Sequence, residues 1–157
     1  MKKLVFSFIG LLLFVFLAAC GNEEESSREF EHASAEVAFT YYDKIKEGNF
    51  EDALDYISPM YLEYIGFTER DFINTFKDRQ TLDGWGIGNI DIRSTEEITE
   101  DVSVAPQFEP LLGANENYLV ILDLEVELDG ETMGVVDHVL VSKDNRDEWK
   151  IVGIVSY

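Results

Sequence analysis

The chain has 157 residues, and its 32 aspartates and glutamates outnumber its 12 lysines and arginines, giving a formal charge of −20 at neutral pH. Such a charge repels nucleic acid and anionic lipid headgroups, so we expect no nucleic-acid partner and no membrane attachment through a basic patch. Hydrophobic residues still make up 46% of the sequence, which favours a folded domain over a disordered chain.

The N-terminal segment follows the pattern of an export signal. Two lysines near the start precede an apolar block at residues 4–17, and small residues then lead to Cys20, the only cysteine. The block closes with the run Leu17-Ala18-Ala19-Cys20, and a polar stretch follows it to Ser27. The pattern predicts a signal peptide over residues 1–19, cleaved directly before the cysteine.

This placement of Cys20 resembles the lipobox of bacterial lipoproteins. The resemblance implies that the Cys20 thiol receives a diacylglyceryl group and that the new amino terminus is acylated. Two or more acyl chains hold a protein stably on a membrane. The implied location is extracytoplasmic, on the outer face of the cytoplasmic membrane or on an outer membrane if present. The alternative is an uncleaved anchor, but residues 4–19 are short against the roughly 20 residues that a bilayer span needs.

Cleavage would leave 138 residues with a formal charge of −22, enough for one domain with its own core. The lipidated Cys20 and a polar tether would occupy residues 20–29, and the domain residues 30–157. With the cysteine committed to lipid, no disulfide is expected, and stability must come from packing.

The first part of the domain is predicted to be helical. Apolar residues recur at helical spacing from Phe30 to Ile45, and Gly48 is placed to end this helix. Asn49 is expected to cap a second short helix, which stops before Pro59. A third helix is expected from Thr68, whose spacing to the acid three residues later indicates a capping arrangement.

The second part of the domain is predicted to be an antiparallel sheet. The glycine-rich residues 84–88 lack the context of a phosphate loop and are interpreted as a turn, with Trp85 against the core and a strand after it. Residues 106–117 are expected to be a loop. Two β-patterned runs, 118–128 and 131–142, flank Asp129-Gly130, a strong hairpin signal. A last strand is predicted over residues 149–155. The fold class is therefore α+β, with helices on one face of the sheet.

This order of elements resembles the NTF2-like, or cystatin-like, family. Two phrases add to the resemblance, Gly-Asn-Phe-Glu-Asp-Ala-Leu at residues 48–54 and Trp-Lys-Ile-Val-Gly-Ile at residues 149–154. The family implies N-terminal helices packed on a curved antiparallel sheet that wraps into a cone, sometimes with a pocket. It includes enzymes, binding domains and surface lipoproteins, so the fold leaves function open.

The hairpin register singles out Asp137. If Asp129 and Gly130 form the turn, Leu122 faces Asp137, which then lies on the apolar face. A carboxylate there would be removed from water and could act as a general base or a polar anchor in a pocket. NTF2-like ketosteroid isomerases are understood to use an aspartate in that way. Two alternatives stay open. A bulge near Gly134 would turn Asp137 outward and His138 inward, and a place near the sheet rim would leave it merely hydrogen-bonded to a tyrosine.

Tyr41, Tyr118 and His138 complete the candidate pocket residues, the tyrosines as possible partners of Asp137. The sequence has only one other histidine, His32, and no histidine or cysteine cluster with metal-ligand spacing. The acidic run 144–148 lacks the glycine and the full ligand series of a calcium loop. We therefore expect no cofactor and no dedicated metal site.

The leading hypothesis is a non-catalytic, membrane-anchored binding module for a small ligand, a peptide or an envelope partner, because no full set of acid, base and oxyanion donor can be named. The alternative is an isomerase-like or dehydratase-like enzyme that uses Asp137 with a tyrosine. A structural role in the envelope is compatible with the first hypothesis.

Overall fold

The computed structural model describes residues 28–99, 101–112 and 116–157. The predicted signal peptide, Cys20 and the tether up to residue 27 lie outside these ranges. The described helices are α1 (Ala33–Lys46), α2 (Phe50–Ala53), α3 (Pro59–Tyr64) and α4 (Glu69–Leu82), with 3-10 turns η1 (Leu54–Tyr56) and η2 (Glu109–Leu111). The strands are β1 (Gly86–Glu97), β2 (Asn117–Leu128), β3 (Glu131–Lys143) and β4 (Trp149–Ser156). This confirms the α+β class. None of the described helices has the length and apolar character needed to cross a membrane.

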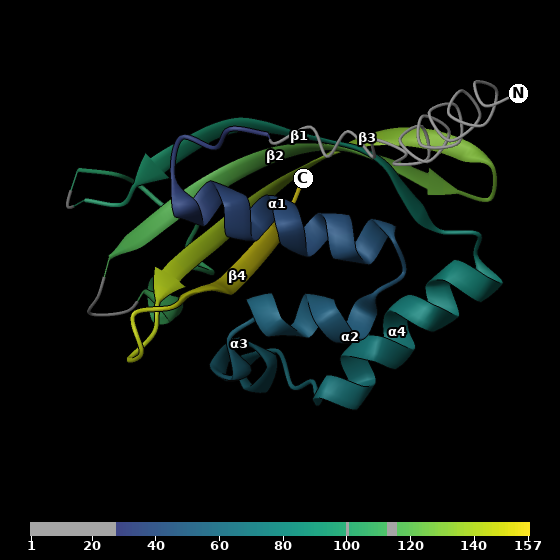
Figure 1. Cartoon of the computed structure of the whole chain (residues 1–157), viewed down its shortest axis with the longest axis horizontal. Helices are drawn as coiled ribbons and strands as arrows, with labels where there is room; N and C mark the ends of the chain where they lie inside the picture. The colour runs from purple at the N-terminus through teal and green to yellow at the C-terminus, as the bar shows by residue number, and fades with distance from the viewer. Residues whose placement is uncertain (1–27, 100, 113–115) are drawn as a thin grey trace, which may run out of the picture.

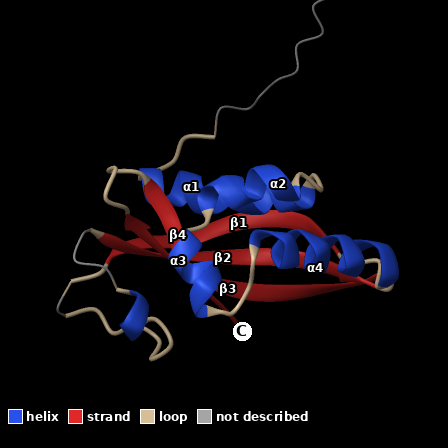
Figure 2. Cartoon of the chain, turned by 90° about the horizontal axis from the view of Figure 1, so that it is seen from below, coloured by secondary structure: helices blue, strands red, loops and turns tan. Residues whose placement is uncertain are grey.

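The four strands form one open antiparallel sheet in the order β1-β2-β3-β4, so each strand pairs with its neighbours in sequence. The helices lie on one face of this sheet, as Figures 1 and 2 show from two directions. Helix α1 contacts all four strands, and α3 and α4 lie further along the same face. The segregation of helices to one side agrees with the prediction and leaves their apolar faces directed at the sheet.

Local sequence signals fix both ends of α1. The Nδ1 atom of His32 accepts a hydrogen bond from the Ser34 amide at 3.1 Å and caps the first turn. At the other end Gly48 adopts a positive φ of 77°, and the amide of Asn49 reaches back to the Lys44 carbonyl. This is the Schellman ending that the glycine predicted. The helix begins at Ala33, three residues after the predicted start at Phe30, because the cap sits at His32.

The segment after α1 differs from the prediction of a single second helix. Asn49 does stand at the N-cap of α2, but its side chain donates to Glu47 and makes no capping bond. The helix tightens into the 3-10 turn η1 and ends before Ser58, as Pro59 indicated. Pro59 then starts α3, a helix that the sequence reasoning missed. Proline lacks the amide hydrogen that the first helical turn leaves unpaired, so it both ended one helix and suited the start of the next.

Helix α4 and the entry to the sheet are close to the prediction. Thr68 and Asp71 form a reciprocal capping box, with the Thr68 amide donating to the Asp71 carboxylate at 3.0 Å. Trp85 follows α4 and packs against Phe76 with ring centroids 5.4 Å apart. The strand then begins at Gly86, inside the predicted turn.

The β2–β3 hairpin has the predicted turn and register. Asp129 and Gly130 both have positive φ, as a type I′ turn requires, and Leu122 faces Asp137. The pairing between β2 and β3 is continuous, so no bulge near Gly134 shifts the strand. Register shifts occur instead in the pairing of β1 with β2 and of β3 with β4.

The sheet is packed on both faces around the middle of β3. On the helix face, the inward side chains of β2, β3 and β4 form a dense layer in which Val139, Val141 and Ile151 are fully buried. On the other face the loop before β2, expected to be irregular, carries η2 and places Phe108 and Leu111 against Gly153. Leu140, which pairs with Gly153, is also fully buried.

The described part of the chain begins with a contact to the sheet. Arg28 belongs to the predicted tether, yet its guanidinium donates to the Ile90 carbonyl at 3.1 Å and lies over the Phe39 ring. The chain therefore meets the body of the domain two residues before the predicted boundary at Phe30.

Candidate functional site

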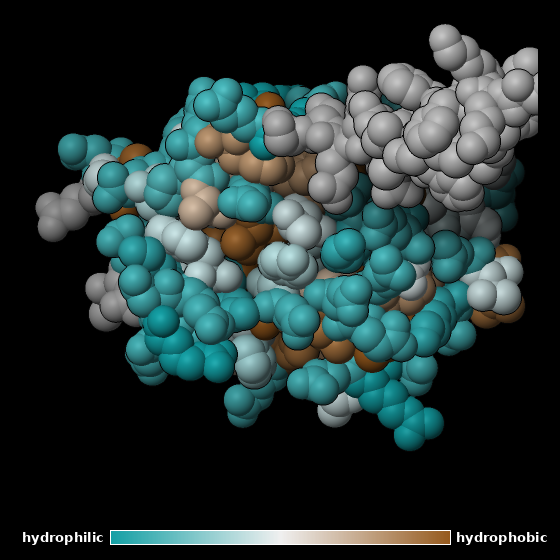
Figure 3. Space-filling model, viewed as in Figure 1, coloured by the Kyte–Doolittle hydropathy of each residue, from teal (hydrophilic) through white to brown (hydrophobic). Residues whose placement is uncertain are grey.

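A cavity of about 500 Å³ lies between the helices and the sheet, toward the end of the sheet that carries the Asp129-Gly130 turn. Its volume is in the range of small-molecule sites. The helices contribute mainly aromatic and aliphatic side chains, among them Tyr41, Tyr42, Ile45, Tyr61, Phe72 and Phe76. The strands contribute Ile87, Leu124, Val126, Val135, Asp137, Ile154 and Ser156. On the face seen in Figure 3, hydrophilic residues predominate among the described residues, and apolar side chains reach the surface in small patches between them.

Asp137 is the carboxylate in this lining. It stands on β3 between Leu122 of β2 and Ser156 of β4, and it is only 5% exposed. The Tyr42 hydroxyl donates to its Oδ2 atom at 2.5 Å. Its Oδ1 atom is the one buried side-chain nitrogen or oxygen among the described residues that has no hydrogen-bond partner. Leaving such an oxygen unpaired costs free energy, so a donor that reached it from the cavity would relieve that cost.

The tyrosines around Asp137 remain protonated donors. Burial raises the pKa of Tyr42 well above its ordinary value, and the nearby Asp137 charge adds to the shift. Burial also raises the pKa of Tyr41, with smaller contributions from Tyr61 and Asp137. An ionised phenol beside a buried carboxylate would place two negative charges in a low dielectric, which explains the direction of both shifts.

Tyr61 adds a third hydroxyl to the lining, but the backbone holds it. Its oxygen accepts from the Ile154 amide at 3.1 Å, and burial raises the pKa of this phenol too. Arg79 and Trp85 line the cavity from the end of α4 and the turn after it, and Arg79 is exposed. The site is therefore mainly apolar, with aromatic and aliphatic walls, one carboxylate inside and one cation at its exposed margin.

The hydroxyl partner of Asp137 is not one of those named from the sequence. Tyr41 does line the cavity, but its neighbour Tyr42 makes the hydrogen bond. Both side chains are buried, and their rings meet at 4.9 Å in an edge-on arrangement. Of the two, the sequence named Tyr41 alone. Successive residues differ by about 100° around a helix, and the docking of α1 on the sheet brings the Tyr42 hydroxyl to Asp137.

Tyr118 and His138 are not part of the cavity. Tyr118 lies on β2, six residues before Leu124, which along a strand is about 20 Å away. Its ring stacks on His32 with centroids 4.0 Å apart, at the start of α1. His138 follows Asp137 directly and therefore points to the opposite face of the sheet, where its ring meets Tyr157 at 4.7 Å. Neither residue therefore lines the cavity that contains Asp137.

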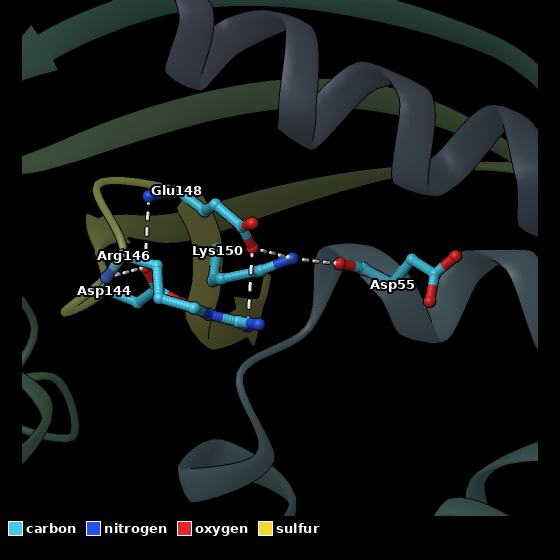
Figure 4. Close-up of polar contacts among 5 residues, drawn as sticks. All are labelled: Asp55, Asp144, Arg146, Glu148 and Lys150. Atoms are coloured by element: carbon cyan, nitrogen blue, oxygen red, sulfur yellow. Dashed lines mark hydrogen bonds and ion pairs between the residues drawn. The ribbon is translucent and has the colours of Figure 1, made fainter.

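The acidic run between β3 and β4 is held by its own contacts (Figure 4). The Asp144 carboxylate accepts from the amides of Arg146 and Glu148, and the Glu148 amide is the largest cause that lowers the pKa of Asp144. Lys150 pairs with Glu148 and donates to the Asp55 carbonyl at 2.7 Å. These carboxylates stabilise a tight turn and its contact with η1. Within the described ranges no cluster of three or more histidine, cysteine or acidic side chains is arranged to hold a metal.

Comparison with known proteins gives no relative from which to carry over a function. No protein-family model matches the chain, and no curated protein matches it. The chemistry of the site therefore depends on its own residues, an apolar cavity with one half-paired carboxylate.

Proposed function

We propose that this protein is a membrane-anchored extracytoplasmic lipoprotein whose single NTF2-like domain binds a small, largely apolar ligand. The observation that carries the proposal is the cavity of about 500 Å³ and the half-paired Asp137 within it. Largely apolar pockets with a few convergent polar groups are typical of small-molecule sites. The helices on one face of an antiparallel sheet support an NTF2-like arrangement, with the cavity in the place where such a domain would hold a ligand.

The membrane attachment in this proposal rests on the sequence around Cys20. A lipid on its sulfur and a polar tether that ends near Arg28 would keep the domain close to the membrane surface. A ligand that partitions into the envelope or diffuses through it would then be met at high local concentration. The acidic surface would keep the domain from lying flat on anionic headgroups.

Ligand binding can be tested with the neutral fluorescent probe N-phenyl-1-naphthylamine. We expect its emission to rise when it enters the cavity, and we expect Val135→Trp, which fills the cavity, to abolish that rise. Thr132→Trp is the matched control, since it places the same ring at an exposed position of β3. Equal binding by both variants and the unaltered protein would locate the probe elsewhere and contradict the proposal.

The anchor is tested separately with Cys20→Ala. We expect this variant to lose labelling by radioactive palmitate and to leave the membrane fraction. A variant that remains membrane-bound would favour the uncleaved anchor over the lipid.

A second candidate function is favoured by the Asp137 geometry itself. An unpaired carboxylate oxygen in an apolar cavity can take a proton from the carbon between the carbonyl and the alkene of a β,γ-unsaturated ketone and return it to the γ-carbon, which isomerises the ketone with no other reactant. Tyr42 is committed to Asp137 and Tyr61 to the Ile154 backbone, so the developing oxyanion would need the Tyr41 hydroxyl. Conversion of such a ketone to its conjugated isomer, followed by ultraviolet absorbance and lost in Asp137→Asn, would establish this activity. Absence of turnover with retained probe binding would leave the binding role alone.

A further inference from the structure

The buried Asp137 carboxylate restricts the chemistry of the ligand. We propose, on the premise that the cavity binds a ligand as above, that it takes apolar amines in their protonated form, with the ammonium donating to Asp137 Oδ1. The two observations behind this are the missing partner of that oxygen and the aromatic character of the walls around it.

Among the described residues, the Asp137 carboxylate has no positively charged partner. Its contact with Tyr42 supplies one neutral donor to Oδ2, and Oδ1 has none. Within the described residues no lysine, arginine or histidine forms an ion pair with Asp137, and Arg79, the cation in the lining, is exposed to water. A buried carboxylate is stable when it is both hydrogen-bonded and paired with charge. An ammonium on the ligand would provide both at once, whereas a hydroxyl would provide only the hydrogen bond.

The walls of the cavity suit a cation with an apolar body. Tyr41, Tyr42, Tyr61, Phe72, Phe76 and Trp85 all line it, and the face of an aromatic ring attracts a cation through its quadrupole. The aliphatic side chains contributed by the strands would cover the remainder of the molecule. A ligand with a free carboxylate would be disfavoured, because its negative charge would lie beside that of Asp137.

The surface charge acts in the same direction. A protein of formal charge −20 concentrates cations near its surface and repels anions, which speeds association with a cationic ligand. This long-range effect does not depend on Asp137, so the test must separate it from the local contact.

Three probes that share one apolar cage make this separation: 1-adamantylmethylamine, 1-adamantylmethanol and 1-adamantanecarboxylic acid. Binding is measured by calorimetry at neutral pH and moderate salt to the mature lipidated protein in nanodiscs, with empty nanodiscs as the blank. We expect the amine to bind about tenfold or more tightly than the alcohol, and the acid to bind most weakly. This comparison needs no variant.

Asp137→Asn then removes the charge while keeping the shape of the side chain. We expect the preference for the amine over the alcohol to disappear in this variant and to remain in Asp123→Asn. Asp123 lies on the neighbouring strand, where Arg93 Nε donates to it at 3.0 Å, and it does not line the cavity, so its loss changes the net charge equally. Equal affinity of the amine and the alcohol for the unaltered protein, or an amine preference that survives Asp137→Asn, would overturn the inference and leave ligand binding intact. Failure of all three probes, together with failure of N-phenyl-1-naphthylamine, would overturn the proposed binding function itself.

Discussion

The two halves of strand β3 present the same face of the sheet to very different interiors. Val139 and Val141 are fully buried in close packing, whereas Val135 and Asp137 line an open cavity. These residues alternate along one strand with the same pleat, so the difference comes from what covers them. Helix α1 contacts all four strands. At the cavity end, side chains of α1, α3 and α4 stand around open space and do not fill it.

The comparison shows that the residues that stabilise the domain by close packing and the residues that line the candidate binding site lie toward different ends of the sheet. Close packing around Val139 supplies hydrophobic burial, and a packed layer on the other face of the sheet adds to it through Phe108 and Gly153. The cavity end instead borders open space and holds a carboxylate that costs free energy to bury. A site that carries such a cost is consistent with a role in binding, since the same volume filled by apolar side chains would be more stable.

The largest expected effect is the difference in stability loss between the same isoleucine-to-alanine substitution at the packed end of the sheet and at the cavity end. Ile151→Ala removes a fully buried side chain from the packed half and should lower the free energy of unfolding by about 2–5 kcal/mol. Ile87→Ala removes the same atoms where they already border the cavity, and the loss should be less than half as large. Urea denaturation of both variants measures the contrast. Equal losses would mean that the cavity end is as well packed as the other.

The next prediction concerns the packed layer behind the sheet. A Cβ atom at Gly153 would lie 2.9 Å from the Phe108 ring, so Gly153→Ala should destabilise the domain by about 1–3 kcal/mol. Gly134 has no atom within 4 Å of the same added carbon, and Gly134→Ala on the cavity half of β3 should be nearly neutral. Thermal unfolding of the two variants tests this, and a neutral Gly153→Ala would show that the loop carrying Phe108 yields easily.

Substitutions at Asp137 and Tyr42 test whether the polar pair in the cavity lowers the stability of the domain. Tyr42→Phe leaves both carboxylate oxygens without a partner and should cost about 1–3 kcal/mol. The double variant Tyr42→Phe/Asp137→Leu removes the whole polar pair and should be at least as stable as the unaltered protein while losing the amine preference. Chemical denaturation gives the stabilities. A double variant less stable than Tyr42→Phe alone would show that the pair serves the fold.

The smallest effect is a pH dependence on the alkaline side. The pKa of Tyr41 is raised in the folded state, so its stabilisation is complete below about pH 10 and is lost as the pH rises further. Tyr41→Phe should therefore reduce the fall in stability between pH 9 and pH 11 by up to about 1.4 kcal/mol for each unit above 10. The non-titrating control Ile45→Val, also buried on α1, should lower stability without changing this slope. Identical slopes in all three proteins would mean that Tyr41 ionises freely.

Local signals explain how much of the fold was predictable. The capping box at Thr68, the Schellman ending at Gly48 and the turn at Asp129-Gly130 each depend on a few neighbouring residues, and each formed as predicted. The helix prediction failed where one residue type is compatible with two local structures. Pro59 can end a helix or begin one, and the sequence did not distinguish these roles.

The candidate site was predictable to the extent that it follows from strand register. The Asp129-Gly130 turn predicted Asp137 on the apolar face provided that no bulge interrupts the hairpin, and the continuous pairing of β2 with β3 removes the bulged alternative. The same register turns His138 to the opposite face, so its place among the candidate pocket residues depended on the bulged alternative. Tyr118, by contrast, lies on the correct face but at the wrong end of its strand, a distinction that depends on where the helices leave space.

By itself the sequence determined the acidic charge, the mixed class and the Asp129-Gly130 turn, because composition and short-range backbone geometry control all three. The structure decided that no bulge interrupts the hairpin, so that Asp137 faces inward. Only the tertiary structure decided that Tyr42 holds the carboxylate, that one of its oxygens is left unpaired, and that a cavity opens beside it. These features depend on how α1, α3 and α4 dock on the sheet, and helix docking is set by packing among many distant residues at once.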